Sequence, residues 1–204
     1  MLKFMINRFS IEQIILFVSL FILLGTACQP FASAPDYKGA VMDPPLPIAD
    51  FELLDTEQKP FQLSDMPDNI KLVFFGYTYC PDVCPLTLAN VRQALDGLPE
   101  RERVSTIFVT VDPERDSPDA LARYLNAFDS SFIGLSDTAE NTAPVLESFG
   151  AYAKKQPIEG SDNYLVDHTA RLYLVTPKQE ILLTYPFGFS SEDLRSDLEY
   201  LLAQ

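Results

Sequence analysis

Short apolar runs and helical patterns alternate along the central part of the chain. Residues 71–76 form an apolar run closed by glycine, which predicts a buried strand, and apolar residues then recur at helical spacing over 88–98. Residues 104–111 predict a second strand, rich in β-branched side chains. The pair Ser117-Pro118 supplies a cap and a first turn for another helix. This alternation is typical of an α/β fold.

Paired strands are predicted on both sides of this central part. Residues 51–54 and 60–63 flank a polar turn and predict an N-terminal β-hairpin. Later in the chain we expect a strand at 132–135 and a helix at 138–149. Two paired strands follow at 171–175 and 181–185, and Ser190 caps a last helix over the final residues. The whole pattern predicts a sandwich in which helices flank a central mixed sheet.

The N-terminal region is interpreted as a targeting segment followed by a proline-rich tether. A positive start and an apolar run over 14–24 lead to Gly-Thr-Ala and then Cys28, which favours a lipoprotein-type signal peptide over 1–27 with Cys28 as the lipid anchor. An ordinary cleaved signal and a short uncleaved membrane anchor remain the alternatives. Prolines are dense over 28–47, so we expect a tether without helix or strand and a domain over 48–204. In each case the domain lies outside the cytoplasm, in the periplasm or an equivalent space.

Composition and charge narrow the classes of function. The chain has 204 residues, of which 47% are hydrophobic, so it can bury a substantial core. Its formal net charge is −14, whereas nucleic-acid binding needs a basic surface, so we expect no nucleic-acid partner.

The candidate chemistry lies where the strand 71–76 gives way to a helix expected to begin at about Pro85 or Leu86. Cys80 and Cys84 are four residues apart, so one turn of helix would bring both sulfur atoms to one side. A thiol beside a helix N-terminus has a lowered pKa. Two converging thiols can oxidise to a Cys80–Cys84 disulfide or hold a soft ion such as Cu(I). An inert structural disulfide is the plainer alternative.

The single histidine of the chain, His168, lies just before a predicted core strand. Strand ends of this kind can face the turn that carries the cysteines. An imidazole beside two thiolates suits copper that cycles between Cu(I) and Cu(II), although two cysteines and one histidine also resemble a catalytic zinc site. Asp167 is a candidate hydrogen-bond partner for the imidazole. The acidic segment 112–116 is interpreted as a capped loop before the next helix, with partner binding as the alternative.

Three segments together resemble the Sco (SCO/SenC) family of copper chaperones. They are Gly-Tyr-Thr-Tyr-Cys-Pro-Asp-Val-Cys-Pro at 76–85, Val-Asp-Pro-Glu-Arg-Asp-Ser-Pro at 111–118 and Val-Asp-His-Thr at 166–169. The resemblance implies a thioredoxin-like fold, membrane attachment and delivery of copper to the binuclear centre in the copper-bearing subunit of cytochrome c oxidase. It also implies Cys80, Cys84 and His168 as the copper ligands. The leader departs from the family pattern, because Gly25 stands where a lipobox usually has leucine.

Two other classes of function compete with a metallochaperone. A thiol–disulfide oxidoreductase would reduce the cysteines of a target before metal is loaded, but such enzymes of thioredoxin type carry C-x-x-C after a tryptophan. This chain has three residues between its cysteines and no tryptophan. A redox sensor or a purely structural lipoprotein is the other alternative.

Overall fold

The computed structural model describes residues 36–204, and residues 37–204 form one compact unit. The predicted signal peptide and Cys28 lie outside the described residues. Within the described part of the chain, no helix is long and apolar enough to cross a membrane.

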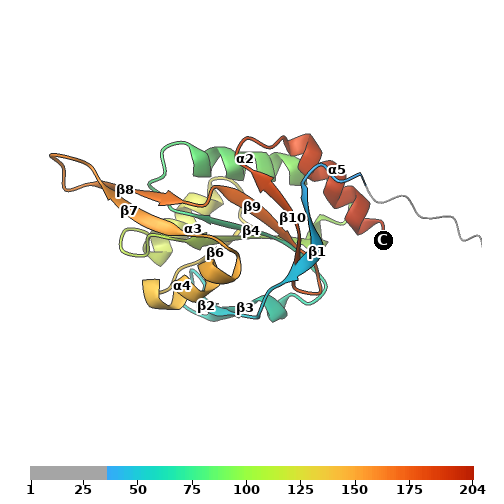
Figure 1. Ribbon diagram of the computed structural model, residues 1–204, viewed down its shortest axis with the longest axis horizontal. Helices are drawn as coiled ribbons and strands as arrows, with labels where there is room; N and C mark the ends of the chain where they lie inside the picture. The colour runs from blue at the N-terminus through green and yellow to red at the C-terminus, as the bar shows by residue number, and fades with distance from the viewer. Residues whose placement is uncertain (1–35) are drawn as a thin grey trace, which may run out of the picture. The chain divides into compact units, whose positions relative to one another are not determined.

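A six-stranded mixed sheet forms the centre of the unit (Figure 1). Its strands, in spatial order, are β1 (Ala40–Pro47), β10 (Glu180–Pro186), β9 (Arg171–Val175), β4 (Ile70–Gly76), β5 (Val104–Thr110) and β6 (Ile133–Leu135). The strands β4, β5 and β6 are parallel, whereas β9, β10 and β1 continue the sheet in antiparallel pairs. The predicted mixed sheet is therefore confirmed.

Helices cover both faces of this sheet because β4 is apolar on both sides. Leu72 and Phe74 of β4 pack in one core with α2 (Val83–Leu95), α3 (Pro118–Asn126) and α5 (Ser191–Leu202). Val73 and Phe75 pack in a second core with α4 (Ala139–Ser148). The hairpin of β2 (Glu52–Leu54) and β3 (Pro60–Gln62), followed by the 3₁₀ helix η1 (Leu63–Asp65), joins the second core. A further 3₁₀ helix, η2 (Arg101–Arg103), precedes β5.

Several local predictions are confirmed. The N-terminal hairpin forms around the expected turn, and the strands β9 and β10 pair across the turn that follows Val175. The Ser117 hydroxyl oxygen accepts a hydrogen bond from the Ala120 N–H at the start of α3. Ser190 caps α5 in the same way. These predictions are correct because the residues that determine each feature are neighbours in the sequence.

The prediction that residues before Ile48 form no strand is wrong. Residues 40–47 form β1, an edge strand whose one partner among the described strands is β10. Edge strands tolerate proline because one side of the backbone needs no partner, and the register shifts between Val41 and Leu46, where two of the prolines lie. The buried Asp197 of α5 accepts hydrogen bonds from the Lys38 and Gly39 amides at 2.9 and 2.8 Å. The folded unit therefore starts near Tyr37.

A second two-stranded sheet was not predicted. It consists of β7 (Ala153–Pro157) and β8 (Tyr164–His168), which extend as an arm to one side of the main sheet (Figure 1). A turn signal, Gly-Ser-Asp-Asn at 160–163, marks the hairpin in the sequence. The strands themselves carry little apolar pattern, because most of their residues are exposed.

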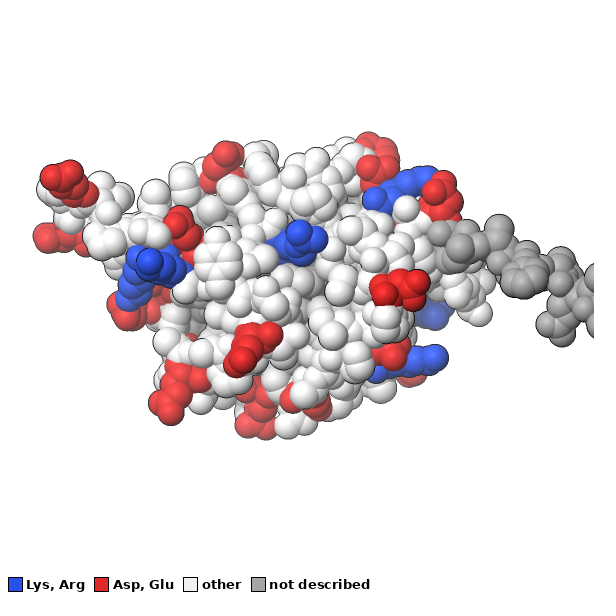
Figure 2. Space-filling model, viewed as in Figure 1, with Lys and Arg blue, Asp and Glu red and all other residues white. Residues whose placement is uncertain are grey.

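The surface agrees with the strongly negative net charge. On the face in Figure 2, acidic side chains are spread over the unit and the basic ones are few and lie apart. The tip of the β7–β8 arm is acidic on this face.

Candidate metal centre

The cysteine-bearing turn begins at the end of β4, where space is very tight. A Cβ atom on Gly76 would lie 2.8 Å from the Cys84 sulfur and 2.8 Å from the Phe108 ring. Only glycine allows the buried Cys84 thiol to pack against the end of the strand. The glycine that closes the apolar run is therefore part of the site.

The helix α2 starts at Val83, two residues earlier than expected from Pro85, so Cys84 lies in its first turn. Asp82 occupies the N-cap position, but its side chain makes no capping hydrogen bond. The Cys84 N–H instead donates to the Cys80 sulfur at 3.3 Å. The sulfur of Cys80 thus accepts a hydrogen bond from an otherwise unpaired amide at the positive end of the helix.

His168 reaches the thiols from the end of β8. Its Nε2 atom lies 3.6 Å from the Cys84 sulfur, and its Nδ1 atom lies 3.3 Å from the Thr169 carbonyl oxygen. The contact at Nδ1 orients the ring so that Nε2 faces the sulfurs. The rings of Phe74 and Tyr77 pack edge-on against the imidazole.

Asp167 does not support the imidazole, contrary to the expectation from the sequence. Successive side chains of a strand point to opposite faces, so Asp167 points away from His168. Its carboxylate accepts a hydrogen bond from the Gln156 amide on β7 at 2.6 Å. The hydrogen-bonding partner of the imidazole is the Thr169 carbonyl instead.

The three candidate ligands converge on one point. The ligating atoms of Cys80, Cys84 and His168 all lie within 4.8 Å of one another. Cys84 is buried, whereas Cys80 and His168 are half-buried at a hollow of about 250 Å³. The site therefore joins a protected sulfur to two ligands within reach of solvent or a partner.

The pKa values of the two thiols are shifted in opposite directions. The hydrogen bond from the Cys84 thiol lowers the pKa of Cys80 to about 4, against the opposing effect of burial. His168 and backbone N–H groups lower it further. The pKa of Cys84 is raised, first by its hydrogen bond with Cys80 and then by burial. At neutral pH the pair therefore holds one thiolate, on Cys80, and one proton, on Cys84.

A sequence profile of the SCO1/SenC family matches residues 42–203. The chain belongs to the SCO1/SenC family. It is 35% identical over 163 residues to the mitochondrial SCO1 homolog 2 of Arabidopsis thaliana, covering 79% of this chain and 57% of that protein. The chain spans between 51% and 59% of the length of three such relatives, from A. thaliana, Mus musculus and Bos taurus.

Solved Sco structures share the fold of this SCO1/SenC chain. The apo Sco1 protein of Thermus thermophilus is 38% identical, with a TM-score of 0.74 over 83% of this chain and 99% of that one. ScoI of Bradyrhizobium japonicum, solved with copper bound, is 34% identical, with a TM-score of 0.69 over 76% and 98%. The predicted thioredoxin-like fold is confirmed.

In this SCO1/SenC protein, the segment 112–116 also contacts the turn that carries Cys80. The buried Asp116 carboxylate accepts hydrogen bonds from the Thr78 N–H at 3.0 Å and the Thr78 hydroxyl at 2.6 Å. It also accepts one from the Thr110 hydroxyl. Asp116 therefore fixes the turn that carries Cys80. The capped loop before α3 forms as expected, but the complete burial of Asp112 and Asp116 within it was not predicted.

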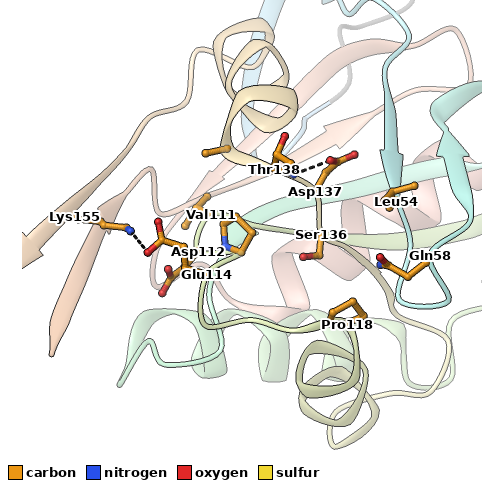
Figure 3. A pocket seen from close by; sticks show the side chains of 12 residues that line it. Leu54, Gln58, Val111, Asp112, Glu114, Pro118, Ser136, Asp137, Thr138 and Lys155 are labelled. Atoms are coloured by element: carbon orange, nitrogen blue, oxygen red, sulfur yellow. Dashed lines mark hydrogen bonds and ion pairs between the residues drawn. The ribbon is translucent and has the colours of Figure 1, made fainter. Parts of the chain in front are cut away.

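A larger cavity borders the same loop but holds none of the three candidate ligands (Figure 3). It measures about 460 Å³ and is lined by residues of α4, the 111–118 loop and the β2–β3 turn. Lys155 of β7 reaches Glu114 beside it. Among the described residues, the chemistry thus lies at the smaller hollow, which Cys80 and His168 line with Cys84 buried beside them.

The thiolate character of Cys80 predicts an unusual pH profile for alkylation. Only the thiolate reacts with iodoacetamide. The rate at Cys80 should stay nearly constant from pH 8 down to pH 5 and fall as the pH approaches 4, because its pKa is lowered to about 4. The buried Cys84 should react far more slowly throughout. Mass spectrometry after timed quenching measures both rates, and a drop of about tenfold at Cys80 between pH 8 and pH 7, as for an ordinary thiol below its pKa, would contradict the assignment.

Proposed function

We propose that this protein is a membrane-attached, extracytoplasmic copper chaperone. It binds one copper ion through Cys80, Cys84 and His168 and delivers it to the binuclear copper centre of cytochrome c oxidase. The observation that carries the proposal is the convergence of two sulfur atoms and one imidazole nitrogen within 4.8 Å. The copper-bound B. japonicum relative and the resemblance of all three motifs to the Sco family support the same assignment.

The donor set suits copper in both oxidation states. Thiolates favour Cu(I), and an imidazole nitrogen adds affinity for Cu(II). Cys80 supplies a thiolate at neutral pH, and Cys84 releases its proton when the metal binds. Two cysteines and one histidine also suit zinc. A copper-loading experiment with zinc in competition separates the two metals.

Membrane attachment rests on the leader. Small residues directly before Cys28 support lipid modification of that cysteine, and residues 29–36 then lead into the folded unit. This arrangement holds the metal site near the membrane in which an oxidase subunit resides. The partner is the copper-bearing subunit of that oxidase, as the family resemblance implies.

A thiol–disulfide oxidoreductase is the second candidate. The low pKa of Cys80 favours it, because a thiolate beside a second thiol can attack a target disulfide. In that reaction the Cys80 thiolate would form a mixed disulfide with the target. Cys84 would then displace the target as a dithiol, leaving a Cys80–Cys84 disulfide. The imidazole at 3.6 Å from the Cys84 sulfur favours the copper function, since disulfide exchange needs no third ligand.

Oxidation of the cysteine pair is expected to abolish copper loading. Copper needs both thiolates, so a Cys80–Cys84 disulfide should reduce uptake from one copper per protein to near zero, and a thiol reductant should restore it. Thiol titration beside copper analysis of the same samples measures both quantities. Undiminished uptake by fully oxidised protein would overturn the proposed site.

A further inference from the structure

The two halves of the metal site come from different sheets. Cys80 and Cys84 follow β4 of the main sheet, whereas His168 ends β8, which pairs only with β7. No strand pairing joins the β7–β8 sheet to the main sheet in the described part of the chain. Apart from the two-residue link from His168 to β9, side-chain contacts therefore set the distance between the imidazole and the thiols.

The free edge of β8 is held by groups from the main sheet and its loops. Successive residues of an antiparallel strand direct their backbone groups alternately toward the partner strand and away from it. The Thr169 N–H, just after β8, donates to the Tyr152 carbonyl on the β7 side. The backbone groups of Val166 and Tyr164 therefore point away from β7. Of these outward groups, the Val166 N–H donates to the Tyr77 hydroxyl at 3.2 Å. The Tyr164 carbonyl accepts a hydrogen bond from Arg115 Nη1 at 2.9 Å.

Arg115 contacts both halves of the site at once. Its guanidinium carbon lies 3.7 Å from the ring centre of Tyr164 on β8 and 4.9 Å from that of Tyr79, next to Cys80. Its Nε atom pairs with the Asp112 carboxylate at 2.5 Å, and the Tyr164 hydroxyl donates to the same carboxylate at 2.7 Å. Asp112, Arg115 and Tyr164 thus form a closed ring of contacts, called the Arg115 clamp below.

We propose that Arg115 is a positioning residue that holds the histidine-bearing strand β8 at the correct distance from the cysteine turn. This inference rests on the proposed copper function for its metal readout but not for its readout on the metal-free protein. The planar guanidinium is needed because it donates along its edge to Tyr164 while its face stacks on aromatic rings. The clamp is also shielded, since the side chains of Arg115 and Asp112 are 18% and 0% exposed.

A second attachment of the hairpin provides the matched control. Lys155 of β7 pairs with Glu114 and its Nζ atom lies 4.8 Å from the ring centre of Tyr164, but the Lys155 and Glu114 side chains are 46% and 70% exposed. Exposed ion pairs contribute little to stability. Lys155→Gln should therefore leave the hairpin and the metal site unchanged, whereas the shielded clamp should be sensitive to a change in shape alone.

The test uses Arg115→Lys, which keeps the positive charge that the buried Asp112 needs for folding. Hydrogen exchange of the Val166 amide in metal-free, reduced protein should become about tenfold faster, because β8 opens locally. Exchange in β4, at Phe74, should not change. Affinity for Cu(II) should fall by about 10–100-fold, with an altered electron paramagnetic resonance spectrum, because supporting contacts orient the ligand. Affinity for Cu(I), which the thiolates dominate, should fall by less than about threefold.

The outcomes separate this inference from the proposed function. Wild-type protein that binds no copper refutes the proposed function, while the exchange rate at Val166 still tests the clamp. Unchanged exchange at Val166 in Arg115→Lys overturns the positioning role. An equal rise at Val166 and Phe74 also overturns it, because the arginine would then stabilise the whole fold. Tyr164→Phe, which removes only the bond to Asp112, should give a smaller change in the same direction as Arg115→Lys.

Discussion

Replacing Cys80 or Cys84 by serine is expected to abolish tight binding of copper in both oxidation states. Each substitution leaves one sulfur and one imidazole, and a hydroxyl is a poor ligand for the soft Cu(I) ion. The affinity for copper should fall by more than about 100-fold, which exceeds the loss typical of a contact that only supports a ligand. Anaerobic competition against a chromophoric Cu(I) chelator measures the Cu(I) affinity, and metal analysis after gel filtration gives the stoichiometry.

The third cysteine gives the control for this experiment. Cys28→Ser replaces a cysteine outside the folded unit, so copper stoichiometry should stay at about one per protein, as three ligands at one site require. The two site variants should also differ in stability. Cys84 is fully buried against Gly76 and Cys80 is half-buried, so Cys84→Ser should destabilise the fold more. Tight stoichiometric binding by the double variant lacking both site cysteines would disprove the assignment.

The cysteine half of the site was predictable because its causes are local. The apolar run, the glycine and the cysteines are consecutive, and a buried strand that leads into a helix necessarily places them at the strand end. The exact helix start was not predictable, because α2 begins with a sulfur as the acceptor that caps its amide. Ordinary capping residues gave no signal there, since the Asp82 side chain does not cap.

The histidine half depends on contacts that no local pattern encodes. His168 could be assigned from the resemblance, but its support could not, because Asp112 and Tyr164 are 52 residues apart in sequence and meet only in the fold. The same reason explains why the burial of Asp112 and Asp116 was not predicted, since their partners Tyr164 and Thr78 are distant in sequence. The strand β1 was missed for the opposite reason: its prolines are a strong local signal, and the sheet edge tolerates them.

His168→Ala is expected to separate the copper function from disulfide exchange. The substitution removes the nitrogen donor, so Cu(II) affinity should fall by about 100-fold or more, while both sulfurs remain to hold Cu(I). Exchange of the thiol pair with a model disulfide should stay within about threefold of wild type, because the first cause of the low Cys80 pKa is the hydrogen bond from Cys84. Cells that depend on this protein should then show low cytochrome c oxidase activity when copper is scarce.

Asp167→Asn is the matched control for His168→Ala, because the neighbouring side chain points away and bonds to Gln156. It should retain Cu(II) affinity and oxidase activity. Both variants should be assayed in parallel for reduction of a target disulfide and for oxidase assembly. If His168→Ala supports normal oxidase assembly while the cysteine variants fail, the imidazole has no role in delivery. The thiol–disulfide oxidoreductase would then be the better assignment, because that reaction needs the two sulfurs alone.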